Sequence, residues 1–181
     1  MSKFTELSLP GVMRFDPPIH RDARGSFVKP FHEEVFAANG AAHTWREAYL
    51  STSVQGVVRG FHFQVPPADH AKLVTCTAGR IFDVVVDLRR SSSAFGRHVV
   101  IELDAQVGTT VILPRGVAHG FTPLSAEATM LYLVETVHDP LCDMGIRWDS
   151  CGVDWPLSQT PILSPRDAAF PLFDQFESPF P

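Results

Sequence analysis

Short runs of Val, Ile, Phe and Thr recur through the middle of the chain, with Gly, Pro, Ser or Asp between them. The runs follow one another at intervals of roughly ten residues, which is typical of the short strands of a β-sandwich or β-barrel. We expect strands over 57–64, 71–76, 80–88, 97–103, 109–114 and 128–136. The hydrophobic pattern therefore predicts an all-β fold.

The run over 80–88 alternates with a period of two, as expected of a strand with two different faces. Asp83, Val85 and Asp87 fall on one face. The other face carries Phe82, Val84, Val86 and Leu88. Burying a carboxylate is costly unless the group is paired, so we expect Asp83 to line a polar interior.

Two segments depart from the strand pattern. Residues 31–40 have helical spacing and end in Asn39-Gly40, a common helix stop. Residues 156–181 are rich in proline, and we expect them to wrap the barrel as irregular segments and short turns. No internal repeat or low-complexity linker interrupts the chain, which predicts one domain over 1–181.

Composition and charge narrow the functional classes. The chain has 181 residues, 45% hydrophobic, and a net charge of −5. This charge argues against nucleic acid, which requires a basic face. No apolar run approaches the roughly 18 residues of a membrane span, and the start of the chain lacks a signal-peptide pattern, so we expect a cytoplasmic protein. Cys76, Cys142 and Cys151 show no metal or disulfide spacing, and we expect buried or idle thiols.

One sequence motif indicates a particular class of β-barrel. Gly108 is followed by Pro114-x-Gly116 and His119, which resembles the second sequence motif of the cupin β-barrels. The first motif of metal-binding cupins supplies His-x-His and a following Glu, but here the matching segment is His62-Phe63-Gln64, with no Glu in the next ten residues. Histidines in a barrel without a complete metal shell indicate acid–base chemistry, with no metal and no cofactor.

Several ionisable residues occur in apolar surroundings: His62, Lys72, His119, Tyr132 and Asp167. Each alone has an ordinary structural explanation, because a lone strand histidine is more often a satisfied core residue and a lone tyrosine a core ring. Together they are more informative, because side chains at alternate positions of neighbouring strands converge inside a barrel.

Across nearly its whole length the chain resembles the dTDP-4-dehydrorhamnose 3,5-epimerase family of nucleotide-sugar epimerases. The motifs that carry the resemblance lie in order at 20–27, 56–67, 70–74, 79–89, 114–121, 132, 145–148, 154–156 and 164–167. The resemblance implies a metal-free, cupin-like jelly-roll barrel with a few short helices, and a homodimer. Bare strand edges would also benefit from pairing with a partner.

The resemblance also implies roles for individual residues. His62 is the base that removes a proton beside a sugar ketone, and Asp167 pairs with it. Lys72 steadies the enolate oxygen, and Tyr132 returns a proton from the opposite face. The remaining residues implied to bind the nucleotide sugar are Arg24, Phe27, Lys29, Glu47, Tyr49, Arg59, Gln64, Asp83, His119, His138 and Arg166. Arg24 and Arg59 would clamp the pyrophosphate.

This chemistry is physically consistent. Removing a proton next to a ketone places negative charge on the oxygen, and a positioned base contributes roughly 10²–10⁴-fold to the rate. Inversion then needs an acid on the opposite face of the ring, because returning the proton to the same face restores the substrate. The substrate already carries its ketone, so no redox cofactor is expected.

Three departures from the family pattern concern the nucleotide side. Lys29 stands where the family has a carboxylate, residues 135–140 lack the usual Tyr-Tyr pair, and Glu47-Ala48-Tyr49 replaces Gln-Asp-Asn. A lysine can only donate hydrogen bonds, so one hypothesis is a base that presents acceptors, such as cytosine, on a CDP-linked or other nucleotide sugar. The alternative is that Lys29 points to solvent and dTDP still binds. Whether C3, C5 or both are epimerised also stays open.

Other functions remain as alternatives. A nucleotide-sugar 3,4-ketoisomerase would need bases placed differently, and Lys72, Tyr132 and Asp167 count against it. A metal-dependent cupin oxygenase would need the missing Glu and second histidine. A non-catalytic sugar-nucleotide-binding cupin predicts binding without exchange of substrate protons.

Overall fold

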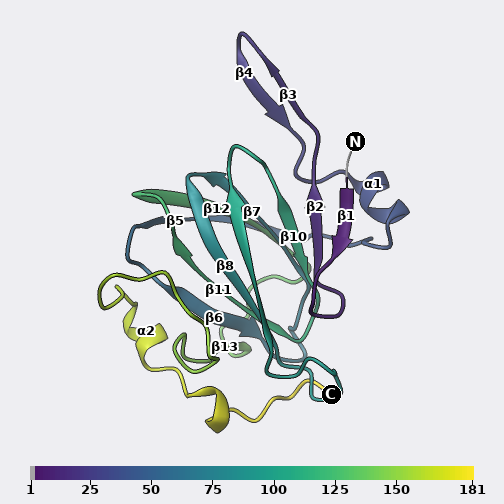
Figure 1. Cartoon of the computed structure of the whole chain (residues 1–181). Coiled ribbons are helices and arrows are strands. Elements are labelled where there is room, and N and C mark those ends of the chain that lie inside the picture. The colour runs from purple at the N-terminus through teal and green to yellow at the C-terminus, as the bar shows by residue number, and fades with distance from the viewer. Residues whose placement is uncertain (1–2) are drawn as a thin grey trace.

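Two antiparallel sheets form the body of the molecule in a computed structural model that describes residues 3–181 (Figure 1). The first sheet has the strand order β1 (Lys3–Glu6), β2 (Met13–Asp16), β10 (Thr110–Leu113), β7 (Lys72–Ala78), β12 (Glu127–Val134) and β5 (Glu47–Val54). The second has the order β13 (Asp143–Gly145), β6 (Arg59–Gln64), β11 (Val117–Pro123), β8 (Arg80–Asp87) and β9 (His98–Asp104). The arrangement confirms the predicted all-β fold.

The main hydrophobic core lies between the two sheets. Val74 and Met130 of the first sheet meet Ile81, Val85 and Phe121 of the second, and all five are buried. Because side chains alternate along a strand, the face of β8 that carries Val85 also carries Asp83 into the interior, where Asp83 is fully buried beside His119. The predicted polar, paired position of Asp83 is therefore confirmed.

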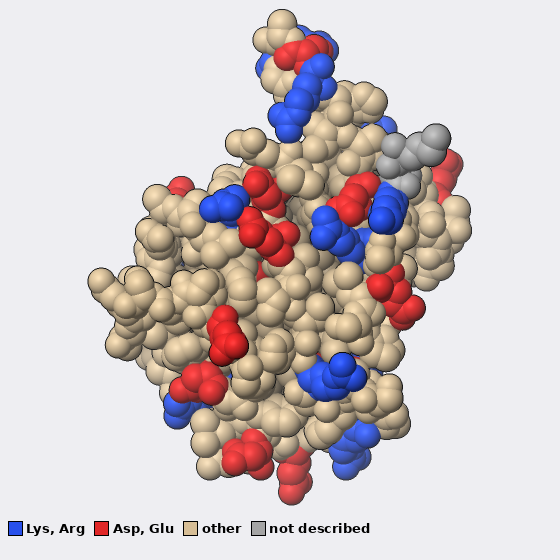
Figure 2. Space-filling view, viewed as in Figure 1, with Lys and Arg blue, Asp and Glu red and all other residues tan. Residues whose placement is uncertain are grey.

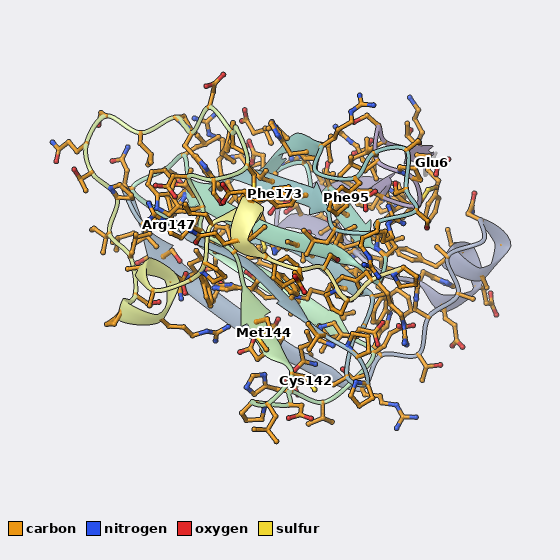
Figure 3. All side chains as sticks on the ribbon, turned by 90° about the horizontal axis from the view of Figure 1, so that it is seen from below. Glu6, Phe95, Cys142, Met144, Arg147 and Phe173 are labelled. Atoms are coloured by element: carbon orange, nitrogen blue, oxygen red, sulfur yellow. The ribbon has the colours of Figure 1, made fainter. Side chains whose placement is uncertain are left out.

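Parts of the outer faces of both sheets are also covered. The even-numbered residues of β8 pack with Phe61 and Phe63 against the C-terminal segment, including Phe180. The 3₁₀ turn η1 (Phe173–Gln175) belongs to this covering, and its Phe173 ring lies 5.7 Å from Phe95 (Figure 3). On the first sheet, Phe36 of α1 (Glu33–Ala38) packs against that sheet's outer face.

The predicted elements are found close to their expected positions. The six predicted strands correspond to β6, β7, β8, β9, β10 and β12. The helix expected in 31–40 is α1, which ends before Asn39 and Gly40. The proline-rich segment is irregular apart from η1 and α2 (Pro165–Ala168), and runs along the lower left of the molecule (Figure 1). Cys76, Cys142 and Cys151 are free and buried, as expected.

A two-stranded hairpin, β3 (Ile19–Asp22) and β4 (Gly25–Val28), projects away from both sheets (Figure 1). Most of its residues are exposed, including Phe27 at 58%. Basic and acidic side chains both gather at its tip (Figure 2). The hairpin therefore presents an apolar ring and charges that its own chain does not cover.

The helices are short, with six residues in α1 and four in α2. Within residues 3–181, none has the length and apolar character needed to cross a membrane.

Candidate active site

Two glycines allow the strands that carry the site histidines to lie unusually close together. Gly60 of β6 has φ of +120°, and a Cβ there would lie 2.6 Å from the Cα of Gly120 on β11. A Cβ on Gly120 would lie 2.9 Å from the Phe61 ring. Because glycine has only a hydrogen atom in place of Cβ, the two strands can pair at this distance. In that pairing His62 lies directly opposite His119.

His62 is bound to a carboxylate from the C-terminal segment. Its Nε2 lies 3.0 Å from Oδ1 of Asp167, a buried residue of α2. Asp167 also accepts from the Gly60 backbone N–H at 3.1 Å and from the Ser164 hydroxyl at 2.8 Å. An ionised carboxylate can only accept, so Nε2 carries the proton of a neutral His62 and Nδ1 is left as the basic atom.

The protonation states suit this arrangement. Burial alone would raise the pKa of Asp167, but the hydrogen bonds from His62, Gly60 and Ser164 outweigh it and hold this pKa at about 2. Burial lowers the pKa of His62 below its ordinary value, and the Asp167 carboxylate offsets only part of that effect. At neutral pH, His62 is therefore an uncharged base held by an ionised carboxylate.

Lys72 lies beside this pair at the start of β7. Its Nζ donates to the backbone carbonyl of His62 at 3.4 Å. Burial lowers the pKa of Lys72 to about 8, although the Asp143 carboxylate partly compensates. A pKa of about 8 keeps most of the side chain charged at neutral pH, so Lys72 can face a developing oxyanion.

Tyr132 of β12 is a buried phenol on the opposite sheet. Its hydroxyl lies 3.3 Å from the Ser51 hydroxyl, and its ring stacks on Tyr49 with the ring centroids 4.5 Å apart. Burial raises the pKa of Tyr132 above its ordinary value. The hydroxyl therefore keeps its proton at neutral pH and is available as an acid.

A second histidine–aspartate pair lies deeper between the sheets. His119 Nε2 and Asp83 Oδ1 are 2.6 Å apart, and both side chains are almost completely buried. The His119 ring lies edge-on to Tyr132, with 6.0 Å between the ring centroids. His62 and His119 are thus each bound to an aspartate of their own. No cluster of metal-ligating side chains is found in the part of the chain that the structure describes.

These residues line two adjoining cavities of about 340 and 140 Å³. Tyr49, His62 and Lys72 border both. The larger is further lined by Glu47, Gln64, His70, Val134, His138, Asp143 and Arg166, and the smaller by Ser51, Arg59, His119, Phe121 and Tyr132. Asp83 and Asp167 lie behind their histidines, so most of the residues proposed from the sequence come together here.

Three of the proposed residues lie elsewhere. Arg24 is at the tip of the projecting hairpin, where it is paired with Asp22. Phe27 is on the same hairpin, and Lys29 follows it as an exposed residue. Within one chain these residues do not line either cavity, so their binding roles stay predictions.

Three polar cavity residues were not among the proposed site residues. Ser51 lies on β5, a strand that the hydrophobic pattern did not indicate. Asp143 binds Arg166 in a two-pronged ion pair, with N–O distances of 2.8 and 2.7 Å. His70 was part of a recognised motif, but only the fold shows it at the cavity, with its Nδ1 2.6 Å from the Thr136 hydroxyl.

The pairing of Arg166 affects the charge of the site. Because Asp143 neutralises Arg166, the cavity-lining cations without a carboxylate partner in residues 3–181 are Lys72 and Arg59. Arg59 instead donates to the Ser53 hydroxyl at 2.8 Å and to the Thr52 carbonyl at 3.2 Å. An anionic substrate would therefore meet two cations whose charge is not already neutralised.

Comparison with known proteins agrees with this geometry. A dTDP-4-dehydrorhamnose 3,5-epimerase from Mycobacterium tuberculosis is 40% identical over 177 residues, 95% of this chain and 88% of the relative. A dTDP-4-dehydrorhamnose 3-epimerase from Streptomyces niveus is 42% identical, covering 89% of this chain and 79% of the relative. The structure of a dTDP-6-deoxy-D-glucose-3,5-epimerase from Legionella pneumophila, in complex with dTDP-4-keto-L-rhamnose, superposes with a TM-score of 0.93 at 31% identity and covers 98% of this chain and 95% of that one.

The cupin-like jelly-roll barrel and the epimerases that match the chain define an isomerase-class enzyme that epimerises its substrate. The family model described as dTDP-4-dehydrorhamnose 3,5-epimerase matches residues 6–175. The chain belongs to the dTDP-4-dehydrorhamnose 3,5-epimerase family.

Proposed function

We propose that the enzyme epimerises C3, C5 or both in a dTDP-linked 4-keto-6-deoxyhexose, and that His62 and Tyr132 act on opposite faces of the sugar ring. The observation that carries this proposal is the position of a neutral, carboxylate-bound His62 on one sheet and a protonated, buried Tyr132 on the other. Both line the same small cavity.

The proposed reaction begins when Nδ1 of His62 takes the proton from the carbon beside the ketone. The electron pair of the broken C–H bond forms an enolate, whose oxygen faces the Lys72 ammonium. One well-placed donor at such an oxyanion contributes about 2.7–4 kcal/mol. The phenol of Tyr132 then gives its proton to the other face of the same carbon, and exchange with solvent restores both residues.

Asp167 has a supporting role in this sequence. Its carboxylate fixes the tautomer that leaves Nδ1 unprotonated, and it stabilises the imidazolium formed when His62 takes the proton. His119 and Asp83 would border the sugar in the smaller cavity.

For the nucleotide we propose dTDP. The relative from Legionella pneumophila was solved with a dTDP sugar. Lys29 is exposed and lines neither cavity of its own chain. The experiment below therefore compares a dTDP sugar with a CDP sugar directly.

We also propose a homodimer in which the hairpin β3–β4 of each chain reaches the site of its partner. The hairpin projects from its own barrel and exposes Phe27 (Figure 1). It carries two of the three proposed residues that the cavities lack, and the third, Lys29, directly follows it. A partner chain would bring Arg24 to the pyrophosphate and would cover the exposed aromatic ring.

A deuterium-exchange experiment tests the chemistry and the nucleotide together. The enzyme is incubated in deuterated water with dTDP-linked and, separately, CDP-linked 4-keto-6-deoxy sugars, and the C3 and C5 proton signals are followed by NMR. We expect loss of one or both signals with the dTDP sugar, and much slower loss with the CDP sugar. His62→Ala should abolish exchange, whereas Tyr132→Phe should still exchange but invert poorly.

Each part of the proposal can fail separately in this experiment. No exchange with any nucleotide would contradict the epimerase chemistry. A clear preference for the CDP sugar would contradict the choice of dTDP. Equal loss of exchange in both variants would contradict the separate roles of His62 and Tyr132.

A further inference from the structure

Tyr49 lies directly against the phenol that we assign as the acid. It is the cross-strand partner of Tyr132 in the β5–β12 pairing. The two rings are nearly parallel, with 13° between their planes and 4.5 Å between their centroids. Aromatic pairs at this separation attract each other beyond the effect of their buried area, so each ring restricts the other.

The surroundings of Tyr132 make Tyr49 important for its orientation. The Ser51 hydroxyl contacts its hydroxyl at 3.3 Å, near the limit for a hydrogen bond, and His119 meets its ring only edge-on at 6.0 Å. The closest aromatic contact of Tyr132 in the described chain is therefore the stacked face of Tyr49. Because β5 is the edge strand of its sheet, no further strand of the same chain supports Tyr132 from that side.

The burial of the two rings differs in a way that fits this role. Tyr132 is 6% exposed, whereas Tyr49 is 39% exposed and borders both cavities. Tyr49 thus shields the acid from one side while part of its own ring stays at the surface. Without that ring, no stacked aromatic neighbour in the described chain would hold Tyr132 from that side.

We propose that Tyr49 is a positioning residue, whose stacked ring holds the phenol of Tyr132 at the angle from which it protonates the carbon opposite His62. This inference rests on the proposed function. It concerns the second half of the reaction alone, because His62 lies on the other sheet and is hydrogen-bonded to Asp167 of α2, whereas Tyr49 stacks on Tyr132.

The experiment measures how the enolate is partitioned. In deuterated water, Tyr132 delivers deuterium to the opposite face and gives inverted product. His62, once its proton has exchanged with solvent, can instead return deuterium to the original face and give labelled substrate. The ratio of labelled inverted product to labelled substrate therefore reports how well Tyr132 is placed, independently of how fast His62 removes protons.

We expect Tyr49→Ala to lower this ratio on the order of tenfold, because a small misplacement of a reacting group strongly reduces its rate. Tyr49→Phe keeps the stacked ring and should retain the wild-type ratio. Leu50→Ala is the matched control: Leu50 is the adjacent residue on β5, is 63% exposed, and points away from Tyr132 because strand side chains alternate. It should leave the ratio unchanged.

An unchanged ratio in Tyr49→Ala would overturn the inference. So would equal losses in Tyr49→Phe and Tyr49→Ala, because the hydroxyl and not the stacked ring would then matter. Absence of labelling by the wild-type enzyme would instead overturn the proposed function on which the inference stands.

Discussion

At the scale of single residues, the carboxylates behind the two histidines decide which nitrogen atoms can act. Asp167 binds Nε2 of His62 and so assigns Nδ1 as the base. Asp83 binds Nε2 of His119 in the same way, but in a fully buried position. The two pairs look alike in chemistry and differ in depth: His62 borders both cavities, whereas His119 borders only the smaller.

These ionisations predict how activity depends on pH. His62 must be neutral, so its lowered pKa keeps activity high until the pH falls below that value. Lys72 must be charged, and with a pKa of about 8 it loses its proton as the pH rises through that value. We therefore expect a profile of kcat/KM against pH that declines on the alkaline side near pH 8, with the acid limb below the ordinary titration range of histidine.

Lys72→Arg identifies the residue responsible for the alkaline limb. A guanidinium stays charged in this range, so the limb should move to higher pH even if the maximal rate falls. An alkaline limb that stays near pH 8 in Lys72→Arg would show that another group causes it.

Residue types and their order were enough to propose His62, Asp167, Lys72 and Tyr132, because each belongs to a recognisable motif. Asp143 and Ser51 could not be found in this way. Asp143 reaches the cavity through a three-residue strand with no hydrophobic pattern, and its function depends on a contact with Arg166, which lies 23 residues away in the sequence. Such pairings are fixed by the fold.

At the scale of elements, the pairing of β6 with β11 brings the site together. The two strands carry His62 and His119 in register, and both contain a glycine where the backbones approach closely. The hydrophobic pattern located β6 but not β11, because Gly120 and Pro123 interrupt it with residues that usually mark turns. It also missed β5, since an edge strand with exposed residues needs few apolar side chains.

Gly60→Ala should therefore lower the free energy of unfolding by about 3 kcal/mol or more, since both the backbone conformation and the space exclude a methyl group. Thermal unfolding would measure the change. Gly40→Ala is the control: Gly40 also has a positive φ, of +75°, but a Cβ there would meet nothing within 4 Å. Its cost should be about 1 kcal/mol, from conformation alone. Equal losses in both variants would show that close packing at Gly60 is unimportant.

At the scale of the whole molecule, the hairpin β3–β4 is the part whose role the packing of the barrel does not explain. It projects from the barrel (Figure 1) and carries Arg24 and Phe27, which line neither site cavity of their own chain. The separation of the hairpin from the site could not be predicted from the sequence. A motif gives the order of residues along the chain, but it does not say which subunit's site those residues belong to. In the proposed dimer the hairpin completes the neighbouring site.

Mixing two inactive variants tests this exchange of hairpins. Arg24→Ala impairs the hairpin and His62→Ala removes the base, so we expect each homodimer to have low epimerase activity. In a mixed dimer, the intact hairpin of the His62→Ala chain would serve the intact base of the Arg24→Ala chain. Co-expression should then restore about one quarter of wild-type activity, because random pairing makes half of the dimers mixed and each has one complete site.

Activity in the mixture no greater than the average of the two variants would show that each hairpin serves its own chain. A monomeric mass for the wild-type protein in analytical ultracentrifugation would contradict the dimer itself.

The position of Asp167 has a consequence for when the enzyme becomes active. The carboxylate that completes the base comes from α2, which follows every strand of both sheets in the sequence. A chain that ended before Pro165 would contain every strand of both sheets and would still lack the partner of His62. Activity thus depends on the docking of the segment that carries α2.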